Sequence, residues 1–190
     1  MRIVAGTFRS RRLRSLKGLA LRPTSDRLRE TLFNILGTRV AGSRFLDLFA
    51  GTGAIGIEAL SRGAAFAVFV ENHAAAVRLI RENLASLEIE SRVQVLAAEV
   101  AAAIRKLERV PDDGFDFVFL DPPYTQEKEY EETLRALEAS SLAGKSTIVI
   151  AEHRKTFELP AALGRLERVR ILRQGDAALS FYRKTGPEGI

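Results

Sequence analysis

The chain has 190 residues, 46% of them apolar and 28% charged, which suits about one domain with a buried core. It contains no cysteine and only two histidines, so disulfides and a thiolate nucleophile are excluded and an imidazole metal site is not expected. No apolar run approaches the roughly 20 residues of a membrane span. The arginine-rich N-terminal sequence lacks the apolar stretch of a secretory signal, so we expect a cytoplasmic protein.

Basic residues are concentrated at the N-terminal end of the sequence. Residues 1–44 hold eleven Lys and Arg against two acids, whereas the remaining residues hold a small excess of acids. Ten of these eleven cations are arginine, whose planar guanidinium suits phosphate. This distribution favours an RNA or DNA partner, and the alternatives are a solubility feature or contact with anionic lipid.

Residues 1–24 are predicted to form a basic arm that contacts RNA. Residues 2–5 and 12–16 have the composition of two short strands, with residues 6–11 as the turn between them, so we expect a small β-hairpin. The arginines expected to contact RNA lie in this arm and on the helix that follows it: Arg9, Arg11, Arg12, Arg14, Arg22, Arg27 and Arg29.

Residues 25–190 are predicted to form one α/β domain. Ser25 is a suitable N-cap for a helix that ends at Gly37, and strands and helices alternate from residue 44 onward. This alternation, with solidly apolar strands, predicts a mostly parallel sheet covered on both faces, followed by an antiparallel hairpin. The expected strands are 44–49, 66–71, 93–97, 115–121, 147–152, 167–173 and 177–183, and the expected later helices are 54–62, 74–87, 100–109 and 128–139.

The strongest local signal is Asp-Leu-Phe-Ala-Gly-Thr-Gly-Ala-Ile-Gly at residues 47–56, where the first parallel strand turns into its helix. Gly51 and Gly53 let a ligand approach the backbone, and Gly56 allows close packing of helix on strand. This spacing also fits the dinucleotide fingerprint, which alone is weak evidence. Glu71 ends the second strand, where its carboxylate could bind both hydroxyls of a ribose, a group that NAD and S-adenosylmethionine share.

Asp47 favours S-adenosylmethionine over a dinucleotide. A carboxylate just before the glycines would repel a pyrophosphate but attract a cationic amino group and a sulfonium. Structural alternatives remain open, because Asp47 could instead bind the N-terminus of the next helix, and Glu71 and Glu99 could be solvated carboxylates. The expected cofactor-binding residues are Asp47, Gly51, Thr52, Gly53, Glu71, Asn72 and Glu99.

The fourth predicted strand ends in Asp121, Pro122, Pro123 and Tyr124. Consecutive prolines have no backbone N–H, so this corner offers hydrogen-bond acceptors without competing donors. A planar exocyclic amine could donate to the Asp121 carboxylate and the Pro122 carbonyl, which would expose its nitrogen lone pair to an electrophilic methyl group. Tyr124 could stack on a base taken out of its helix. The alternative is a rigid turn, but the sequence favours Asp121, Pro122 and Tyr124 as catalytic residues, without a metal ion.

Residues 47–56 together with residues 121–124 resemble the S-adenosylmethionine-dependent N-methyltransferases of the class I, Rossmann-like type. The segment Arg-Pro-Thr-Ser-Asp-Arg-Leu-Arg-Glu at residues 22–30 narrows the resemblance, as does Gly-Asp-Ala-Ala-Leu-Ser-Phe-Tyr-Arg at residues 175–183. Over nearly its whole length, the chain is similar to the bacterial 16S rRNA (guanine(966)-N(2))-methyltransferase family.

This resemblance implies a seven-stranded, mostly parallel sheet with an antiparallel C-terminal strand. It implies methyl transfer from S-adenosylmethionine to the guanine 2-amino group of 16S rRNA, by a monomer that acts on the assembled or assembling 30S subunit. By position, Asp47, Gly51 and Gly53 would line the methionine end of the cofactor, Glu71 would bind its ribose, and the Asp-Pro-Pro-Tyr corner would hold the guanine. One departure stands at residues 98–100, which are Ala-Glu-Val where the family tends to show Gly-Asp-Ala.

Three other functions share some of these features. A DNA adenine-N6 or cytosine-N4 methyltransferase would use the same corner, but the chain has no extra segment to read base edges. A nicotinamide-dependent dehydrogenase would leave the basic arm unexplained. A noncatalytic RNA-binding assembly protein would bind RNA without methyl transfer, and the intact glycine and Asp-Pro-Pro-Tyr elements argue against it.

Overall fold

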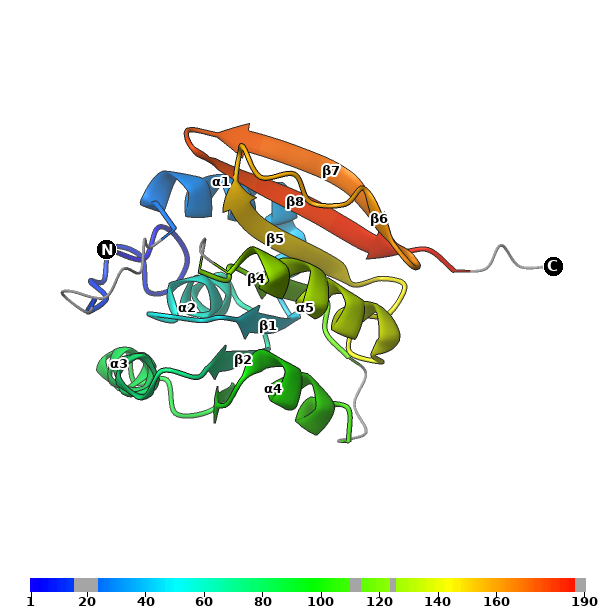
Figure 1. The fold of residues 1–190 in the computed structure, drawn as a ribbon. Helices are drawn as coiled ribbons and strands as arrows, with labels where there is room; N and C mark the ends of the chain where they lie inside the picture. Colours follow the sequence, from blue (N-terminus) through cyan, green and yellow to red (C-terminus); the bar gives the residue numbers. More distant parts are fainter. Residues whose placement is uncertain (16–23, 110–113, 124–125, 187–190) are drawn as a thin grey trace. The chain divides into compact units, whose positions relative to one another are not determined.

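The computed structural model describes residues 1–15, 24–109, 114–123 and 126–186. The chain divides into two compact units, Met1–Glu99 and Val100–Ile190 (Figure 1). Within the described ranges, the two units contain five α-helices, one 3-10 helix and eight strands. None of the helices in these ranges is both long and apolar enough to cross a membrane. Two predicted site residues, Arg22 and Tyr124, lie outside the described residues.

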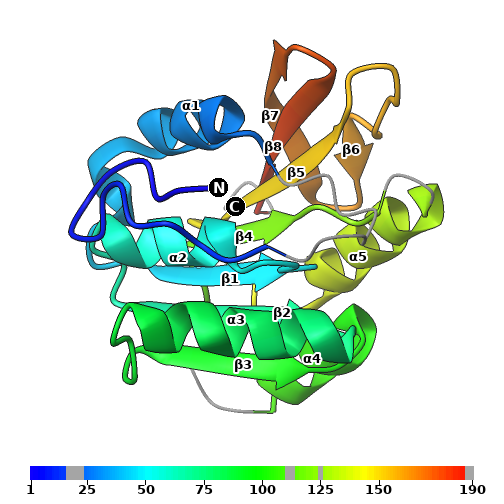
Figure 2. The ribbon, with the colours of Figure 1, turned by 90° about the vertical axis from the view of Figure 1, so that its left-hand side faces the viewer.

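The first unit is built on three parallel strands. In chain order it contains α1 (Asp26–Leu36), η1 (Gly37–Val40), β1 (Arg44–Leu48), α2 (Ala54–Ser61), β2 (Phe66–Glu71), α3 (Ala74–Ser86) and β3 (Val93–Ala97). The strands lie in the order β3-β2-β1, and each pairs in parallel with its neighbour. Helix α2 packs on β1 and β2, α3 packs on β2 and β3, and both lie on the same side of the strands (Figure 2).

The second unit is built on a mixed set of strands. In chain order it contains α4 (Val100–Leu107), β4 (Phe117–Leu120), α5 (Glu127–Ala139), β5 (Ile148–Arg154), β6 (Ala162–Leu163), β7 (Leu166–Gln174) and β8 (Ala177–Lys184). The strands lie in the order β4-β5-β8-β7-β6. Strands β4 and β5 are parallel, and the three remaining neighbours pair antiparallel.

Local sequence explains where these elements begin. The Ser25 side chain accepts a hydrogen bond from the Leu28 amide at 3.1 Å, so α1 starts at the predicted cap. Its buried residues include Leu28, Leu32 and Leu36, at helical spacing. The apolar run Phe66–Glu71 is almost wholly buried, as expected of a strand whose two faces are both covered.

One prediction about the strands, their number, is wrong. The structure adds an eighth strand, β6, which pairs antiparallel with β7. With only two residues, β6 is too short to show the alternating pattern from which a strand is predicted. The N-terminal hairpin is present in short form: Arg2 and Arg12 form an antiparallel bridge, the Ile3 amide donates to the Arg11 carbonyl at 3.0 Å, and the Leu13 amide donates to the Met1 carbonyl at 3.1 Å. The amides of Val4 and Ala5 donate to the side-chain carboxylate of Glu58, which ties the hairpin to α2.

Gly56 allows α2 to lie directly against β2, as its place in the glycine motif predicts. A Cβ atom at this position would stand 2.3 Å from Cε1 of Phe69, a β2 side chain that is fully buried. Core side chains are close-packed and cannot yield that much space without strain. The close contact fixes where the glycine motif lies relative to the strands.

We expect Gly56→Ala to lower the free energy of unfolding by about 1–3 kcal/mol, the usual cost of overpacking a core. Gly144→Ala is the matched control, since a Cβ there meets only Thr147 Oγ1 at 3.8 Å and should change stability little. Urea denaturation of both variants checks the expectation. Equal stability of the two would contradict this account of the packing.

Candidate functional site

The loop after β1 has an unusual backbone. Phe49, Gly51 and Gly53 all have positive φ, at 62°, 54° and 77°. Glycine adopts this conformation freely, but a bulky residue such as Phe49 pays for it, and such strain gathers at functional sites. The Ala50 amide donates to the Val70 carbonyl at 2.9 Å, which ties the loop to β2. The loop therefore has a defined backbone conformation that a hydrogen bond holds against β2.

The buried side chain of Asp47 binds the backbone just after this loop. Its side chain is 1% exposed, and Oδ2 accepts the Gly56 amide at 2.9 Å in the first turn of α2. Asp47 thus binds the N-terminus of α2, as the structural alternative from the sequence proposed. Burial raises the pKa of Asp47 to about 7, the Gly56 hydrogen bond lowers it, and the negative charge of Glu71 raises it. A positive charge placed nearby would favour the ionised form.

Glu71 braces the loop from the neighbouring strand. Its Oε2 accepts the Gly51 amide at 2.8 Å and its Oε1 accepts the His73 amide at 2.8 Å. A carboxylate has about four lone-pair sites, so both oxygens can also accept hydrogen bonds from ligand hydroxyls. Glu71 therefore shapes the glycine loop and still has capacity for a ribose.

The structure brings the predicted cofactor residues of the first unit to one edge. They lie at the carboxyl ends of β1, β2 and β3, where open α/β sheets bind ligands. Asn72 Nδ2 donates to Glu99 Oε1 at 3.0 Å, and both side chains are exposed. Glu99 thus reaches the end of β2 despite its departure from the family pattern. In the described residues, no group of His, Asp and Glu could hold a metal ion.

The second unit holds the described part of the predicted acceptor corner. Asp121 and Pro122 follow β4 directly, with Asp121 half-buried and Pro122 buried. The hydroxyl of Tyr130 in α5 donates to the Glu152 carbonyl at 2.8 Å and lies 3.5 Å from the Pro122 carbonyl. Sequence reasoning missed Tyr130, because its helix position indicates burial but not the backbone groups that its hydroxyl contacts.

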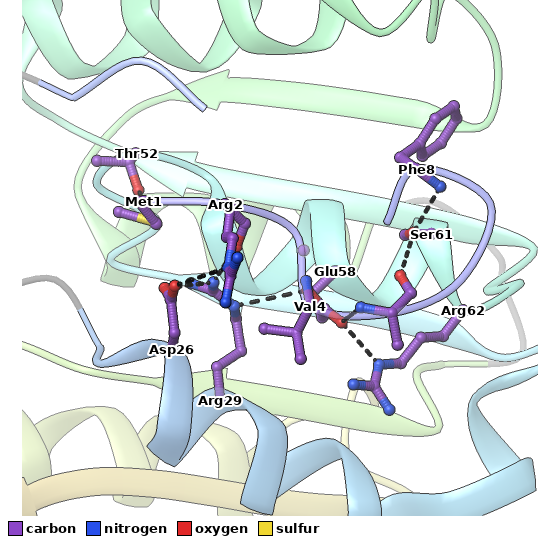
Figure 3. A network of polar contacts seen from close by, with 12 residues as sticks. Met1, Arg2, Val4, Phe8, Asp26, Arg29, Thr52, Glu58, Ser61 and Arg62 are labelled. Carbon is purple, nitrogen blue, oxygen red and sulfur yellow. Dashed lines mark hydrogen bonds and ion pairs between the residues drawn. The ribbon is translucent and has the colours of Figure 1, made fainter. Parts of the chain in front are cut away.

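Residues 1–15, the N-terminal strap, run over the outer side of α2 (Figure 2). A buried carboxylate, Glu58, holds them there: its two oxygens accept the Val4 amide at 2.8 Å and the Ala5 amide at 3.0 Å (Figure 3). Arg62 donates to Glu58 at 2.8 Å, and Arg29 lies 3.6 Å from it. Glu58 was not predicted as a site residue, since one acid within an apolar helix carries no motif.

The prediction that Arg29 contacts RNA is wrong. Its side chain is fully buried, forms an ion pair with Asp26 at 2.9 Å and donates to the Arg2 carbonyl (Figure 3). A guanidinium that is fully buried beside two carboxylates cannot reach a phosphate. Arg29 therefore belongs to the core that carries the strap.

Arg9, Arg11, Arg12, Arg14 and Arg27 are exposed, in contrast to Arg29. Two of them touch α3, since Arg14 pairs with Glu82 at 3.0 Å and Arg11 donates to the Ser86 carbonyl at 2.7 Å. An exposed ion pair such as Arg14–Glu82 is worth about 0–1 kcal/mol, so Arg14 can exchange it for a phosphate.

We expect the substitution Asp47→Asn to change how stability depends on pH. Asp47 ordinarily titrates near 3.8 and titrates near 7 in the folded protein, so its contribution to stability is present below pH 4 and is lost as the pH rises through 7. An asparagine oxygen can still accept the Gly56 amide but cannot ionise. Relative to wild type, the variant should therefore gain stability between pH 4 and pH 8 in urea denaturation. A pH-independent difference would contradict the raised pKa.

Comparison with known proteins supports one family. The family model described as "Conserved hypothetical protein 95" matches residues 1–183. The chain is 34% identical to "Putative rRNA methyltransferase YlbH" of Bacillus subtilis, over 98% of this chain and 100% of that protein. It is 33% identical to "Ribosomal RNA small subunit methyltransferase D" of Escherichia coli, over 97% of this chain and 90% of that protein.

A solved structure described as "Putative methyltransferase yhhF from Escherichia coli" matches with a TM-score of 0.82 and 33% identity, over 97% of each chain. A structure described as a putative RNA methyltransferase from Pyrococcus horikoshii matches with a TM-score of 0.67 at 18% identity, which speaks for the fold alone. The predicted class I, Rossmann-like α/β fold is confirmed. The chain belongs to the family of the small-subunit rRNA methyltransferase D proteins.

Proposed function

We propose that this protein transfers a methyl group from S-adenosylmethionine to the 2-amino group of a guanine in 16S rRNA. The observation that carries the proposal is the rigid glycine loop between the carboxylates of Asp47 and Glu71, at the carboxyl ends of parallel strands. The name of the Escherichia coli relative supports small-subunit rRNA as the substrate. Guanine 966 as the target rests on the family resemblance.

The residues around the glycine loop suit S-adenosylmethionine. Burial raises the pKa of Asp47 to about 7, so its ionised form lacks a compensating positive charge. A cationic amino group of the cofactor would supply that charge and stabilise the carboxylate. Glu71 would accept hydrogen bonds from the ribose hydroxyls, and Asn72 with Glu99 would lie at the adenine side. When bound, this cofactor supplies an electrophilic methyl group on its sulfonium.

The acceptor amine would be held in the second unit. The carboxylate of Asp121 accepts one N–H of the guanine amine, and the Pro122 carbonyl accepts the other. Both acceptors then draw the hydrogens away from the base plane, which frees the nitrogen lone pair for attack on the methyl group. The Asp121 carboxylate would take the proton that the methylated nitrogen loses. Tyr130 holds the neighbouring backbone through the Glu152 carbonyl, so the corner is braced before the base arrives. On sequence grounds we assign Tyr124 as the stacking surface for the base.

The exposed arginines of the strap would bind RNA phosphates. Arg9, Arg11, Arg12 and Arg14 lie on one short segment, and Arg27 lies on α1. We include Arg22 in this surface on sequence grounds. A monomer that acts on the assembled or assembling 30S subunit would use them to grip the rRNA around the target base.

Incubation with radiolabelled S-adenosylmethionine tests the function. The acceptors compared are 30S particles, bare 16S rRNA and DNA, with digestion of the product to modified nucleosides. The proposal expects N2-methylguanosine from 30S particles or bare rRNA. Label in DNA would support the DNA methyltransferase alternative, and RNA binding without label would support a noncatalytic role.

We expect Asp121→Ala to keep cofactor affinity and lose methyl transfer by about 100- to 1000-fold, the usual loss for one group that stabilises a transition state. Asp176→Ala is the matched control, because Asp176 is an exposed acid of the same unit in the β7–β8 turn. Single-turnover rates and calorimetric cofactor titrations separate chemistry from binding. Normal turnover of the Asp121 variant would remove this carboxylate from the mechanism.

Neutralising Arg9, Arg11, Arg12 and Arg14 together should weaken RNA binding and flatten its salt dependence. Each lost phosphate contact should reduce the log–log slope by about 0.7–0.9. The control variant removes four exposed charges of the second unit, at Arg105, Lys106, Arg135 and Lys155, so that both variants have the same net charge. If the arginines serve only solubility, the strap variant will keep the wild-type slope.

A further inference from the structure

Asn83 is a buried amide on α3 for which the proposed chemistry has no use. Its side chain is fully buried, and burying an amide without hydrogen-bond partners is strongly unfavourable. Its hydrogen-bond partners therefore indicate the role of the Asn83 side chain. They lie on two segments distant in sequence, the N-terminal strap and the glycine loop.

On the strap, Asn83 binds one residue through both of its backbone groups. The Arg14 amide donates to Asn83 Oδ1 at 2.8 Å, and Asn83 Nδ2 donates to the Arg14 carbonyl at 3.2 Å. The side-chain amide thus pairs with Arg14 much as a neighbouring strand would. The Arg14 side chain remains exposed on the other side.

On the glycine loop, the same Nδ2 donates to the Thr52 carbonyl at 3.0 Å. Thr52 stands between Gly51 and Gly53, and its hydroxyl also contacts Met1 Sδ at 3.9 Å. An amide nitrogen has two hydrogens, so one can go to the strap and the other to the loop. A displacement of either segment strains the hydrogen bond to the other.

We infer that Asn83 couples the N-terminal strap to the cofactor loop. A ligand bound in the loop would then stabilise the docked strap, and RNA bound to the strap would raise the affinity of the loop for its ligand. This inference rests on the proposed function and adds a positioning residue to it. Coupling of this kind is reciprocal and usually amounts to about 5- to 150-fold in affinity. A cofactor-loaded enzyme would then grip rRNA better than an empty one.

Amide hydrogen exchange with and without saturating S-adenosylhomocysteine tests the coupling. In the wild-type protein, the ligand should slow exchange of the Arg14 amide about fivefold or more. In Asn83→Leu, this response should disappear. The Val4 and Ala5 amides, which Glu58 holds, should stay protected and show that the strap is still docked.

Glu82→Gln is the matched control. Glu82 lies next to Asn83 and contacts the strap only through the exposed Arg14 side chain, so the variant should keep the wild-type response to the ligand. If Asn83→Leu releases the strap, the coupling is tested instead with Asn83→Asp, by measuring its affinity for S-adenosylhomocysteine. This variant keeps the acceptor for the Arg14 amide but turns an oxygen toward two carbonyls, and should weaken S-adenosylhomocysteine binding about fivefold or more.

The outcomes separate the two proposals. If the wild-type protein binds S-adenosylhomocysteine and Arg14 exchange does not change, the coupling is refuted and the proposed function stands. An Asn83 variant that keeps the full ligand response would also refute it. If the wild-type protein does not bind this ligand, the proposed function fails and the coupling fails with it.

Discussion

Buried carboxylates that bind backbone amides determine the architecture of the first unit. Asp47 binds the Gly56 amide, Glu71 binds the Gly51 amide, and Glu58 binds two successive amides of the strap. A carboxylate removed from water is costly unless donors or cations compensate it, so each arrangement is stable only as a complete set. The same three acids fix the start of α2, the glycine loop and the path of the strap.

These carboxylates differ in how they are compensated, and the difference separates structure from function. Glu58 is compensated by the positive charges of Arg29 and Arg62 within the chain itself. Asp47 relies on a backbone amide, and burial raises its pKa to about 7, so it would gain from a cationic ligand. A buried acid without a full counter-charge beside a strained glycine loop supports the proposed site for a cofactor that carries a cationic amino group and a sulfonium.

The sequence predicted the elements well because their signals are local. The apolar run of β2 and the cap at Ser25 involve neighbouring residues, and both lie where expected. The error at Arg29 concerns a contact between distant residues. Arg29 is buried beside Glu58 of α2, whose two oxygens also accept the Val4 and Ala5 amides. Periodicity and composition carry no record of such pairings.

Calorimetric titration with S-adenosylmethionine tests the central claim, that the braced glycine loop is the cofactor site. The account predicts that wild type binds and that Glu71→Ala weakens binding about tenfold or more, since a hydrogen bond to a charged group is worth about 1.5–3 kcal/mol. Gly53→Val should also weaken binding, because a branched side chain at a φ of 77° would strain the loop where the ligand approaches its backbone. Glu90→Ala, at an exposed acid of the same unit, should bind as wild type. Unchanged affinity in both loop variants, with the fold intact by circular dichroism, would place the cofactor elsewhere and contradict the account.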